Sequence, residues 1–156
     1  MAAAEGVRIR RAAATDAAAM QAMESLFPSD RMSMRSIRRF IRSTSARVLV
    51  ALRDGELLGN LVLLLREGSD KARIYSVVVS PAARGLGIGN SLVDAAERAS
   101  RGAGRKTVTL EVRADNTAAR ALYAGRGYIE ARHLRAYYDD GADGLRLTLA
   151  LEPRRT

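Results

Sequence analysis

Hydrophobic residues recur along the chain with two spacings, one typical of strands and one typical of helices. Residues 7–10 alternate as an edge strand, and a first helix is expected after a cap at Thr15 or Asp16. The apolar face of this helix is expected at Met20, Met23, Leu26 and Phe27. A second helix is predicted to begin at Ser33 or Ser36 and to carry Ile37, Phe40 and Ile41.

The middle of the chain predicts strands on both sides of a helix. Strands are expected over 48–53 and 57–66, and Asp54-Gly55 between them is a strong signal for a tight hairpin. Residues 73–80 are rich in β-branched side chains and stop at Pro81, which indicates a buried central strand. A glycine-rich loop, a helix over 91–100 and a strand over 107–113 follow. This order predicts a parallel strand pair with a right-handed crossover.

The last third predicts one short helix and two more strands. The helix covers 117–124 with Asn116 as its cap, and the strands cover 128–132 and 145–151. The fold class is therefore predicted to be α/β (α+β), with one mixed sheet flanked by helices. A chain of 156 residues without a repeat or a low-complexity linker favours a single domain over 1–156.

Composition excludes several kinds of chemistry. The absence of cysteine excludes a disulfide framework, a Cys-ligated zinc and a thiol nucleophile, and a single histidine makes a metal site unexpected. The longest aliphatic run, 61–65, is far shorter than the roughly 20 residues of a membrane span. Residues 1–11 lack the apolar region of a secretory signal, so a cytoplasmic location is expected.

The charge balance favours an anionic partner without identifying one. There are 26 Lys plus Arg residues against 17 Asp plus Glu, a net charge of +9 that is carried almost entirely by arginine. Arginine binds phosphate well, but a general bias of the sequence toward Ala and Arg explains the count equally well. Nucleic-acid binding is not expected, because the arginines are scattered and aromatic residues make up only 4% of the chain.

The glycine-rich run 84–89, Arg-Gly-Leu-Gly-Ile-Gly, lies between the predicted central strand and the following helix. Glycines there let backbone N–H groups point outward, and the helix N-terminus adds a partial positive charge. The run therefore predicts a pyrophosphate-binding loop. It matches neither the Walker loop, which requires Gly-Lys-Ser/Thr, nor the Rossmann spacing G-x-G-x-x-G.

From this run onward the chain resembles the GNAT family of acyl-CoA-dependent N-acetyltransferases. Arg84, Gly87 and Gly89 match the family motif Q/R-x-x-G-x-G/A. Further elements follow in the order and spacing of the family: Leu110-Glu111-Val112-Arg113, Asn116, Ala119, Leu122-Tyr123, Gly127-Tyr128 and Tyr137-Tyr138. The nearest likeness is to the bacterial ribosomal-protein-alanine N-acetyltransferase branch. The resemblance is strongest over 74–149 and implies a GNAT fold, with about seven strands, a splayed parallel pair and about four helices.

The resemblance also implies acetyl-CoA as the cofactor and assigns residues to it. The pantetheine is expected beside the strand residues Val77, Val78 and Val79, with Asn116 and Tyr123 on its other side. The pyrophosphate is expected on the backbone of Arg84, Gly85, Leu86, Gly87, Ile88, Gly89 and Asn90. Asn116 is also a plain helix cap, and this alternative stays open.

Acetyl transfer needs a base for the amine, a donor for the departing sulfur and a donor for the carbonyl oxygen. Glu111 is expected to take the amine proton directly or through water, and Tyr123 to protonate the sulfur, since a phenol at ~10 and a thiol at ~8.5 have similar pKa values. A backbone N–H near Val79 is expected to bind the oxyanion. In the alternatives, Glu111 pairs with Arg113 or Arg120 and Tyr123 is a core residue. His133 is expected on a strand surface without a catalytic role.

The predicted acceptor-binding residues are Ser29, Asp30, Met32, Tyr137 and Tyr138, although the tyrosines could instead pack on the sheet edge. An α-amine, with a pKa of ~7.7 to 8.0, loses its proton more readily than a lysine amine at ~10.4. The predicted acceptor is therefore a protein or peptide N-terminus, and acidic residues over 139–143 could attract its ammonium group. The alternatives are a small-molecule amine such as an amino acid, a polyamine or a drug, and a silent acyl-CoA-binding module. The chain is expected to be a monomer or homodimer.

Overall fold

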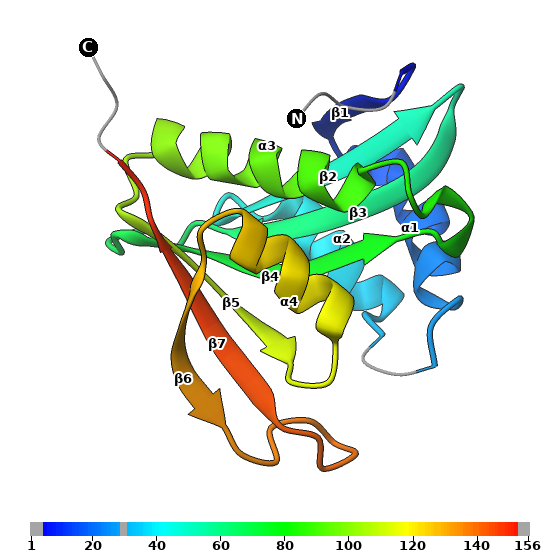
Figure 1. The fold of residues 1–156 in the computed structure, drawn as a ribbon. Helices are drawn as coiled ribbons and strands as arrows, with labels where there is room; N and C mark the ends of the chain where they lie inside the picture. The colour runs from blue at the N-terminus through cyan, green and yellow to red at the C-terminus, as the bar shows by residue number, and fades with distance from the viewer. Residues whose placement is uncertain (1–4, 29–30, 153–156) are drawn as a thin grey trace.

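A seven-stranded sheet in the order β1-β2-β3-β4-β5-β7-β6 runs through the protein in a computed structural model, which describes residues 5–28 and 31–152 (Figure 1). The strands are β1 (Arg8–Arg11), β2 (Ala46–Arg53), β3 (Glu56–Leu64), β4 (Lys71–Val79), β5 (Thr107–Arg113), β6 (Ile129–Leu134) and β7 (Gly144–Ala150). Only β4 and β5 pair in parallel, and the other neighbours are antiparallel. The predicted mixed sheet with one parallel pair is confirmed.

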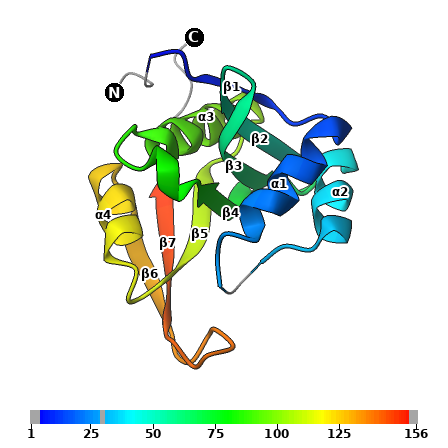
Figure 2. The ribbon, with the colours of Figure 1, turned by 90° about the vertical axis from the view of Figure 1, so that its right-hand side faces the viewer.

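Four α-helices of the described residues cover the sheet, two on each face (Figure 2). They are α1 (Ala17–Glu24), α2 (Met34–Arg42), α3 (Ile88–Gly102) and α4 (Thr117–Gly125). On the α1–α2 face the core is built from Met20, Ile37, Val48, Val50 and Val62. On the other face α3 packs on β3 and β5 through Leu92, Val93, Leu61, Leu63 and Leu110. None of the described helices is long and apolar enough to cross a membrane.

The hairpin between β2 and β3 confirms the strongest short-range signal in the sequence. Asp54 and Gly55 have φ angles of 50° and 78°. Two successive left-handed residues match the right-handed twist of the strands they join, and Asp-Gly tolerates this conformation better than most pairs.

Two helix boundaries differ from the prediction. The helix α1 ends at Glu24, so Phe27 and Leu26, which is 58% exposed, lie beyond it. The carboxylate of Asp16 does not cap this helix, because it accepts the N–H of Ala13 and pairs with Arg10 at 2.8 Å. The helix α3 begins at Ile88 instead of residue 91, since Gly87 with φ 72° starts the helix within the glycine run.

A bulge at Tyr75 in β4 separates the two parallel strands. Val62 of β3 pairs with Ser76 and Leu63 pairs with Ile74, which leaves Tyr75 as an extra residue. Such a bulge bends its strand. The pairing of β4 with β5 stops at Ile74 and Leu110, although both strands continue beyond these residues. The open wedge between the two strands is the splay that the family resemblance implies.

Candidate active site

Two clefts meet at the splay. The first, of about 390 Å³, is lined by β4 from Ile74 to Val79, β5 from Leu110 to Arg113, and α4. The second, of about 450 Å³, reaches from the same strands toward the start of α2. We call them the α4-side cleft and the α2-side cleft. Both are lined by Ile74, Tyr75, Ser76, Glu111 and Tyr138. A ligand in one cleft can therefore contact a ligand in the other.

The predicted cofactor strand offers an open edge to the α4-side cleft. Val77, Val78 and Val79 pair with β3 on one side and have no strand partner on the side that faces β5. Val77 and Val79 pack against the α3-side core. These side chains hold the strand in place. Buried peptide groups need hydrogen-bond partners, so the backbone N–H and C=O groups of the free edge are available to bind a ligand.

The glycine loop fits a pyrophosphate. Gly85 and Gly87 have φ angles of 85° and 72°, and a Cβ at either position would meet nothing within 4 Å, so the space in front of their backbone is open. The N–H groups of Ile88 and Gly89 belong to the first turn of α3 and have no intrahelical acceptor. Open backbone at the start of a 15-residue helix is suited to an anion.

Gly89 has a different role from the other two glycines. A Cβ at this position would lie 3.2 Å from Leu122 Cδ1 of α4. Its small size therefore permits the close approach of α3 and α4, whereas Gly85 and Gly87 provide the loop conformation. The sequence motif alone does not distinguish these two uses of glycine.

Asn116 is a helix cap that also lines the α4-side cleft. Its Oδ1 accepts the N–H of Ala119 at 3.1 Å, as the cap prediction requires. The residue is exposed and lies among the cleft residues. The cap is confirmed, and a contact with pantetheine remains a prediction.

Tyr123 is buried at the wall of the α4-side cleft, with 7% of its surface exposed. Its ring packs edge-on against Tyr128 at a centroid distance of 5.3 Å, and its hydroxyl has no hydrogen-bond partner among residues 5–28 and 31–152. Burial, and to a lesser degree the charge of Glu97, raises the pKa of Tyr123 to about 12. The phenol is thus a neutral donor at physiological pH.

The raised pKa of Tyr123 favours hydrogen-bond donation to the sulfur over the expected proton transfer. The phenol at about 12 lies well above a thiol at ~8.5, so complete transfer to a thiolate is uphill by about 5 kcal/mol. Donation of a hydrogen bond to a developing thiolate needs no such transfer. Desolvation of the ring moves the pKa of Tyr123 away from that of a thiol.

A buried carboxylate holds α4 against α3. Arg126, just after α4, donates to Glu97 Oε2 at 3.0 Å and to Oε1 at 2.9 Å, and the Tyr128 hydroxyl donates to Oε2 at 3.0 Å. The position of Tyr123 therefore depends on this network. The sequence does not indicate this network, because Glu97 and its partners are about 30 residues apart and share no motif.

Glu111 lies in both clefts, and only 7% of its side chain is exposed. It forms ion pairs with Arg73 of β4 and, at 3.4 Å, with Arg146 of β7. The pairs suggested from the sequence are wrong. Arg113 pairs with Asp115 and Asp140, and Arg120 pairs with Glu130. Strand register brings Arg73 and Arg146 to Glu111, and the sequence does not reveal that register.

Three of the predicted acceptor residues lie in the α2-side cleft, namely Met32, Tyr137 and Tyr138. The two tyrosine rings stand perpendicular at 5.1 Å between centroids. Ser29 and Asp30 lie outside the described residues.

The acidic loop and His133 are engaged away from the clefts. Asp140 pairs with Arg113, and Asp143 pairs with His133 at 2.8 Å. His133 is exposed on β6 and lines neither cleft, which agrees with its expected place on a strand surface. Because these two carboxylates have local partners, attraction of an ammonium group by the loop is weaker than the sequence suggests.

Glu24 is a second buried carboxylate that no sequence motif indicates. This residue is 4% exposed, lines the α4-side cleft and accepts the N–H of Met32 at 3.0 Å. Burial raises the pKa of the Glu24 carboxyl above its usual value, against the opposing effect of the Met32 N–H. An acidic residue one helical turn after Met20, on the apolar face, was the available signal. Its hydrogen bond links the end of α1 to Met32, which lines the α2-side cleft.

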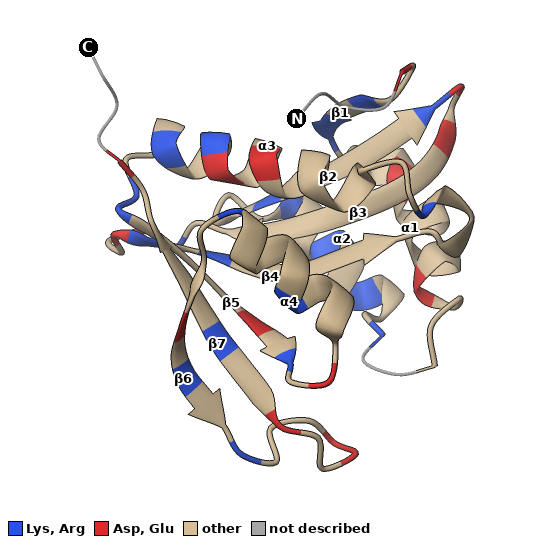
Figure 3. Ribbon diagram, in the orientation of Figure 1, with Lys and Arg blue, Asp and Glu red and all other residues tan. Residues whose placement is uncertain are grey.

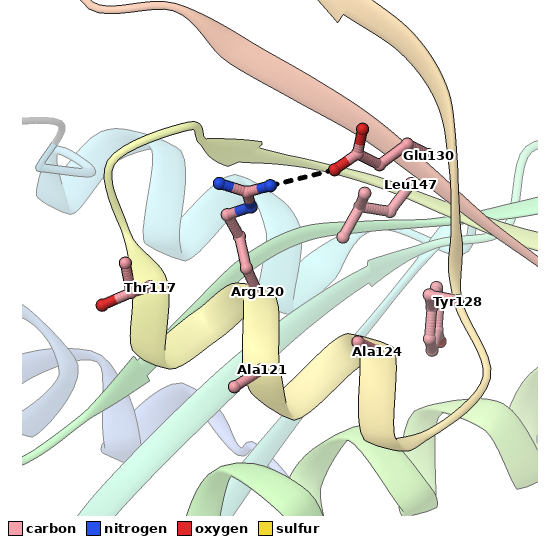
Figure 4. Close-up of a pocket in the computed structure, with 7 residues that line it drawn as sticks. All are labelled: Thr117, Arg120, Ala121, Ala124, Tyr128, Glu130 and Leu147. Atoms are coloured by element: carbon pink, nitrogen blue, oxygen red, sulfur yellow. Dashed lines mark hydrogen bonds and ion pairs between the residues drawn. The ribbon is translucent and has the colours of Figure 1, made fainter.

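A third pocket, of about 330 Å³, lies between α4 and the strands β6 and β7 (Figure 4). Arg120 and Glu130 pair across it at 3.0 Å. Its lining includes none of the predicted site residues. Within the described part of the chain, no three His, Cys, Asp or Glu residues are grouped so that they could hold a metal ion.

The strand order and the splay define the fold class as that of the GNAT acetyltransferases. The sequence profile of the Acetyltransferase (GNAT) family matches residues 14–128. The chain therefore belongs to the GNAT acetyltransferase family, a family of enzymes, and the resemblance seen in the sequence is confirmed.

Named relatives and solved structures agree with this assignment. The chain is 34% identical over 124 residues to the N-alpha-acetyltransferase MAK3 of Arabidopsis thaliana, a match that covers 78% of this chain and 65% of that protein. The ribosomal-protein-S18-alanine N-acetyltransferase of Escherichia coli has the same fold, with a TM-score of 0.86, 24% identity and 96% coverage of both chains. The NatC complex bound to Gag peptide and CoA contains a similar fold, with a TM-score of 0.82, 21% identity and coverage of 94% of this chain and 99% of that chain.

Proposed function

We propose that this chain is an acetyl-CoA-dependent N-acetyltransferase, formed by a single domain, that transfers the acetyl group directly to a peptide or protein N-terminal α-amine. The observation that carries the proposal is the splay, where Glu111 and Tyr123 line one cleft beside the open edge of β4. The absence of cysteine from the chain supports direct transfer, since no thiol is present to hold the acetyl group.

The chain offers separate parts for the two ends of the cofactor. The backbone of Gly85, Gly87 and the first turn of α3 binds the pyrophosphate, and the free edge of Val77 to Val79 binds the pantetheine. When bound, acetyl-CoA supplies the acetyl group as a reactive thioester. The neutral Tyr123 hydroxyl donates a hydrogen bond to the sulfur as negative charge develops on it.

Glu111 accepts the proton of the acceptor amine. Its carboxylate lies where the two clefts meet, and its oxygens face Arg73 and Arg146. In the free protein both arginines hold the carboxylate, and Arg146 keeps it oriented when the acceptor nitrogen arrives. A proton leaving an α-amine near pH 8 needs only a weak base, and this favours an N-terminus over a lysine side chain.

The relatives support the same acceptor class. The Arabidopsis relative is named an N-alpha-acetyltransferase, and the NatC complex was solved with a peptide and CoA. The α2-side cleft opens beside the segment between α1 and α2 and is flanked by Tyr137 and Tyr138. This arrangement suits a chain end that enters from the α2 side while the cofactor lies on the α4 side.

Release of coenzyme A from acetyl-CoA over a panel of acceptors tests the proposal. The panel contains short free-terminus peptides, the same peptides with a blocked terminus and a free lysine, polyamines, free amino acids and an aminoglycoside. Turnover confined to free-terminus peptides is the expected result. Turnover only on small amines would overturn the α-amine assignment. Tight acetyl-CoA binding without turnover on any acceptor would instead favour a silent binding module.

A further inference from the structure

Positive charge dominates the acceptor side of the splay. The charged residues that line the α2-side cleft are Arg31, Arg73 and Glu111. Arg146 contacts Glu111 from the neighbouring strand. Two guanidinium groups thus contact the Glu111 carboxylate, and that of Arg31, which donates to the Phe27 carbonyl, adds a third positive charge to the lining of the cleft. The α4-side cleft, in contrast, is lined by Glu24, Glu111 and Arg113, and Arg113 has carboxylate partners of its own.

Arg73 has an unused hydrogen-bond donor at this place. Its Nη2 contacts Glu111, whereas its Nε is buried and has no partner among the described residues. The guanidinium lies 5.8 Å from the centre of the Tyr75 ring. Buried donors are nearly always satisfied in proteins, so this Nε–H marks Arg73 as a guanidinium with spare hydrogen-bonding capacity. The Arg73 side chain is 40% exposed, so other parts of it are open to an anionic ligand in the cleft.

The positive charge continues along the open face of the sheet. Arg146 of β7 stands directly opposite Arg132 of β6, and it is also opposite Glu111 of β5, so the three side chains share one face. Like charges directly opposite each other destabilise a strand pair. No ion pair of Arg132 is formed within the described residues. Figure 3 shows basic segments of β6 and β7, in blue, in the same half of the sheet as an acidic segment of β5, in red.

We infer that the acceptor is a peptide that carries a carboxylate close to its α-amine, in an acidic side chain at its first or second residue. The inference rests on the proposed function, since it names the acceptor class of the same site. The carboxylate binds Arg73 in the α2-side cleft, with Arg31 and Arg146 within the same charged region. Charge complementarity with these three arginines distinguishes this acceptor from neutral and basic peptides.

Binding of such a peptide would also release the base. Arg73 holds one oxygen of Glu111 in the free protein. A substrate carboxylate that binds Arg73 competes for this guanidinium and frees that oxygen to accept the proton of the amine. The acidic acceptor is therefore expected to have a higher kcat as well as a lower KM.

Matched peptides test the inference. Amidated peptides of one length begin with alanine followed by Asp, Asn or Lys, and a second set has Asp, Asn or Lys at the first position. Coenzyme A release gives kcat/KM for each. In at least one set, kcat/KM for the Asp peptide is expected to be about tenfold higher than for the Asn peptide, which is the effect of one charge-assisted hydrogen bond. The difference from the Lys peptide is expected to be larger. The advantage is expected to shrink in high salt.

Variants show whether Arg73 carries the preference. Arg73→Gln removes the charge and keeps a polar side chain, so the Asp-to-Asn ratio is expected to fall to about one. Arg73→Lys keeps the charge and is expected to retain part of the ratio. Arg101→Gln removes one charge from the exposed end of α3, outside both clefts, and is expected to leave the ratio unchanged.

The outcomes separate this inference from the proposed function. Equal rates on Asp and Asn peptides, or faster rates on Lys peptides, would overturn the acidic acceptor while leaving the α-amine acetyltransferase intact. An unchanged ratio in Arg73→Gln would also overturn it, provided that thermal unfolding shows the variant is folded. No turnover on any free-terminus peptide would instead contradict the proposed function itself.

Discussion

The two clefts that meet at the splay are built in different ways. The predicted cofactor site takes its ligand-binding groups from the backbone of one continuous stretch, which runs from the end of β4, at the α4-side cleft, through the glycine loop into α3. The α2-side cleft takes them from side chains of the segment before α2, of β4 and β5, and of the loop between β6 and β7. A backbone site is determined by local conformation, whereas a side-chain site is determined by how distant strands align.

Because of this difference, substitutions are expected to affect the two clefts differently. Backbone groups bind the invariant parts of a cofactor, and few side-chain changes alter them unless they alter the loop itself. Guanidinium and carboxylate groups can be exchanged one at a time without moving the strands. Under the proposed function, the α4-side cleft binds the cofactor and the α2-side cleft selects the acceptor.

The largest effect is expected where the clefts meet. Glu111→Gln removes the base and is expected to lower kcat by about a hundredfold or more at pH 6.5, with a smaller loss at pH 9, where an α-amine is already neutral. Steady-state rates across this range measure the effect. The affinity for coenzyme A is expected to stay within about twofold, because the backbone site is untouched.

The exposed Glu56→Gln at the start of β3 is the matched control for this charge change. A loss of rate in Glu111→Gln that is the same at both pH values would assign Glu111 a purely structural role.

A substitution in the glycine loop is expected to weaken coenzyme A binding without altering the acceptor site. Gly87→Val places a branched side chain in the open space before the loop and is expected to weaken coenzyme A binding about thirtyfold by calorimetry. The left-handed φ of 72° also strains the valine backbone, at a cost to stability of about 1–3 kcal/mol.

Gly104→Val separates the two effects, since Gly104 has a φ of 75° and no atom near its added Cβ, and it follows the C-terminal end of α3, whereas Gly87 lies at the N-terminal end. It should lose similar stability and keep coenzyme A affinity. Equal affinities for the two variants would remove the pyrophosphate role from Gly87.

A smaller effect is expected for the buried phenol. Tyr123→Phe removes the donor to the leaving sulfur and is expected to lower kcat about tenfold. Because the hydroxyl has no partner in the described part of the chain, the free energy of unfolding should change by less than about 1 kcal/mol. Urea unfolding and steady-state rates give the two numbers, and a large loss of stability with full activity would identify Tyr123 as a core residue only.

The smallest effect concerns the alkaline side of the pH profile. A phenol whose pKa is raised to about 12 stays protonated up to that pH, so its donor form persists through the working range. Titration of Tyr123 should therefore change the rate on a free-terminus peptide by less than about twofold between pH 9 and pH 10.5. A descending limb in this range that disappears in Tyr123→Phe would contradict the raised pKa.

The sequence predicted the parts of the molecule that depend on local chemistry. The Asp54-Gly55 turn, the cap at Asn116 and the glycine run before α3 each need particular residues at adjacent positions. The fold class followed from the order of such elements. Errors occurred where local signals were ambiguous, as at Asp16, whose carboxylate binds Arg10 instead of capping a helix.

Only the tertiary structure determined which charged side chains contact one another on the acceptor side. Glu111 was found from its motif, but its partners Arg73 and Arg146 are 38 and 35 residues away and meet it through strand register. The same holds for the desolvation of Tyr123 and for the contact of Glu24 with Met32. Electrostatic interactions depend on distance and burial, and a linear sequence specifies neither until the strands have paired.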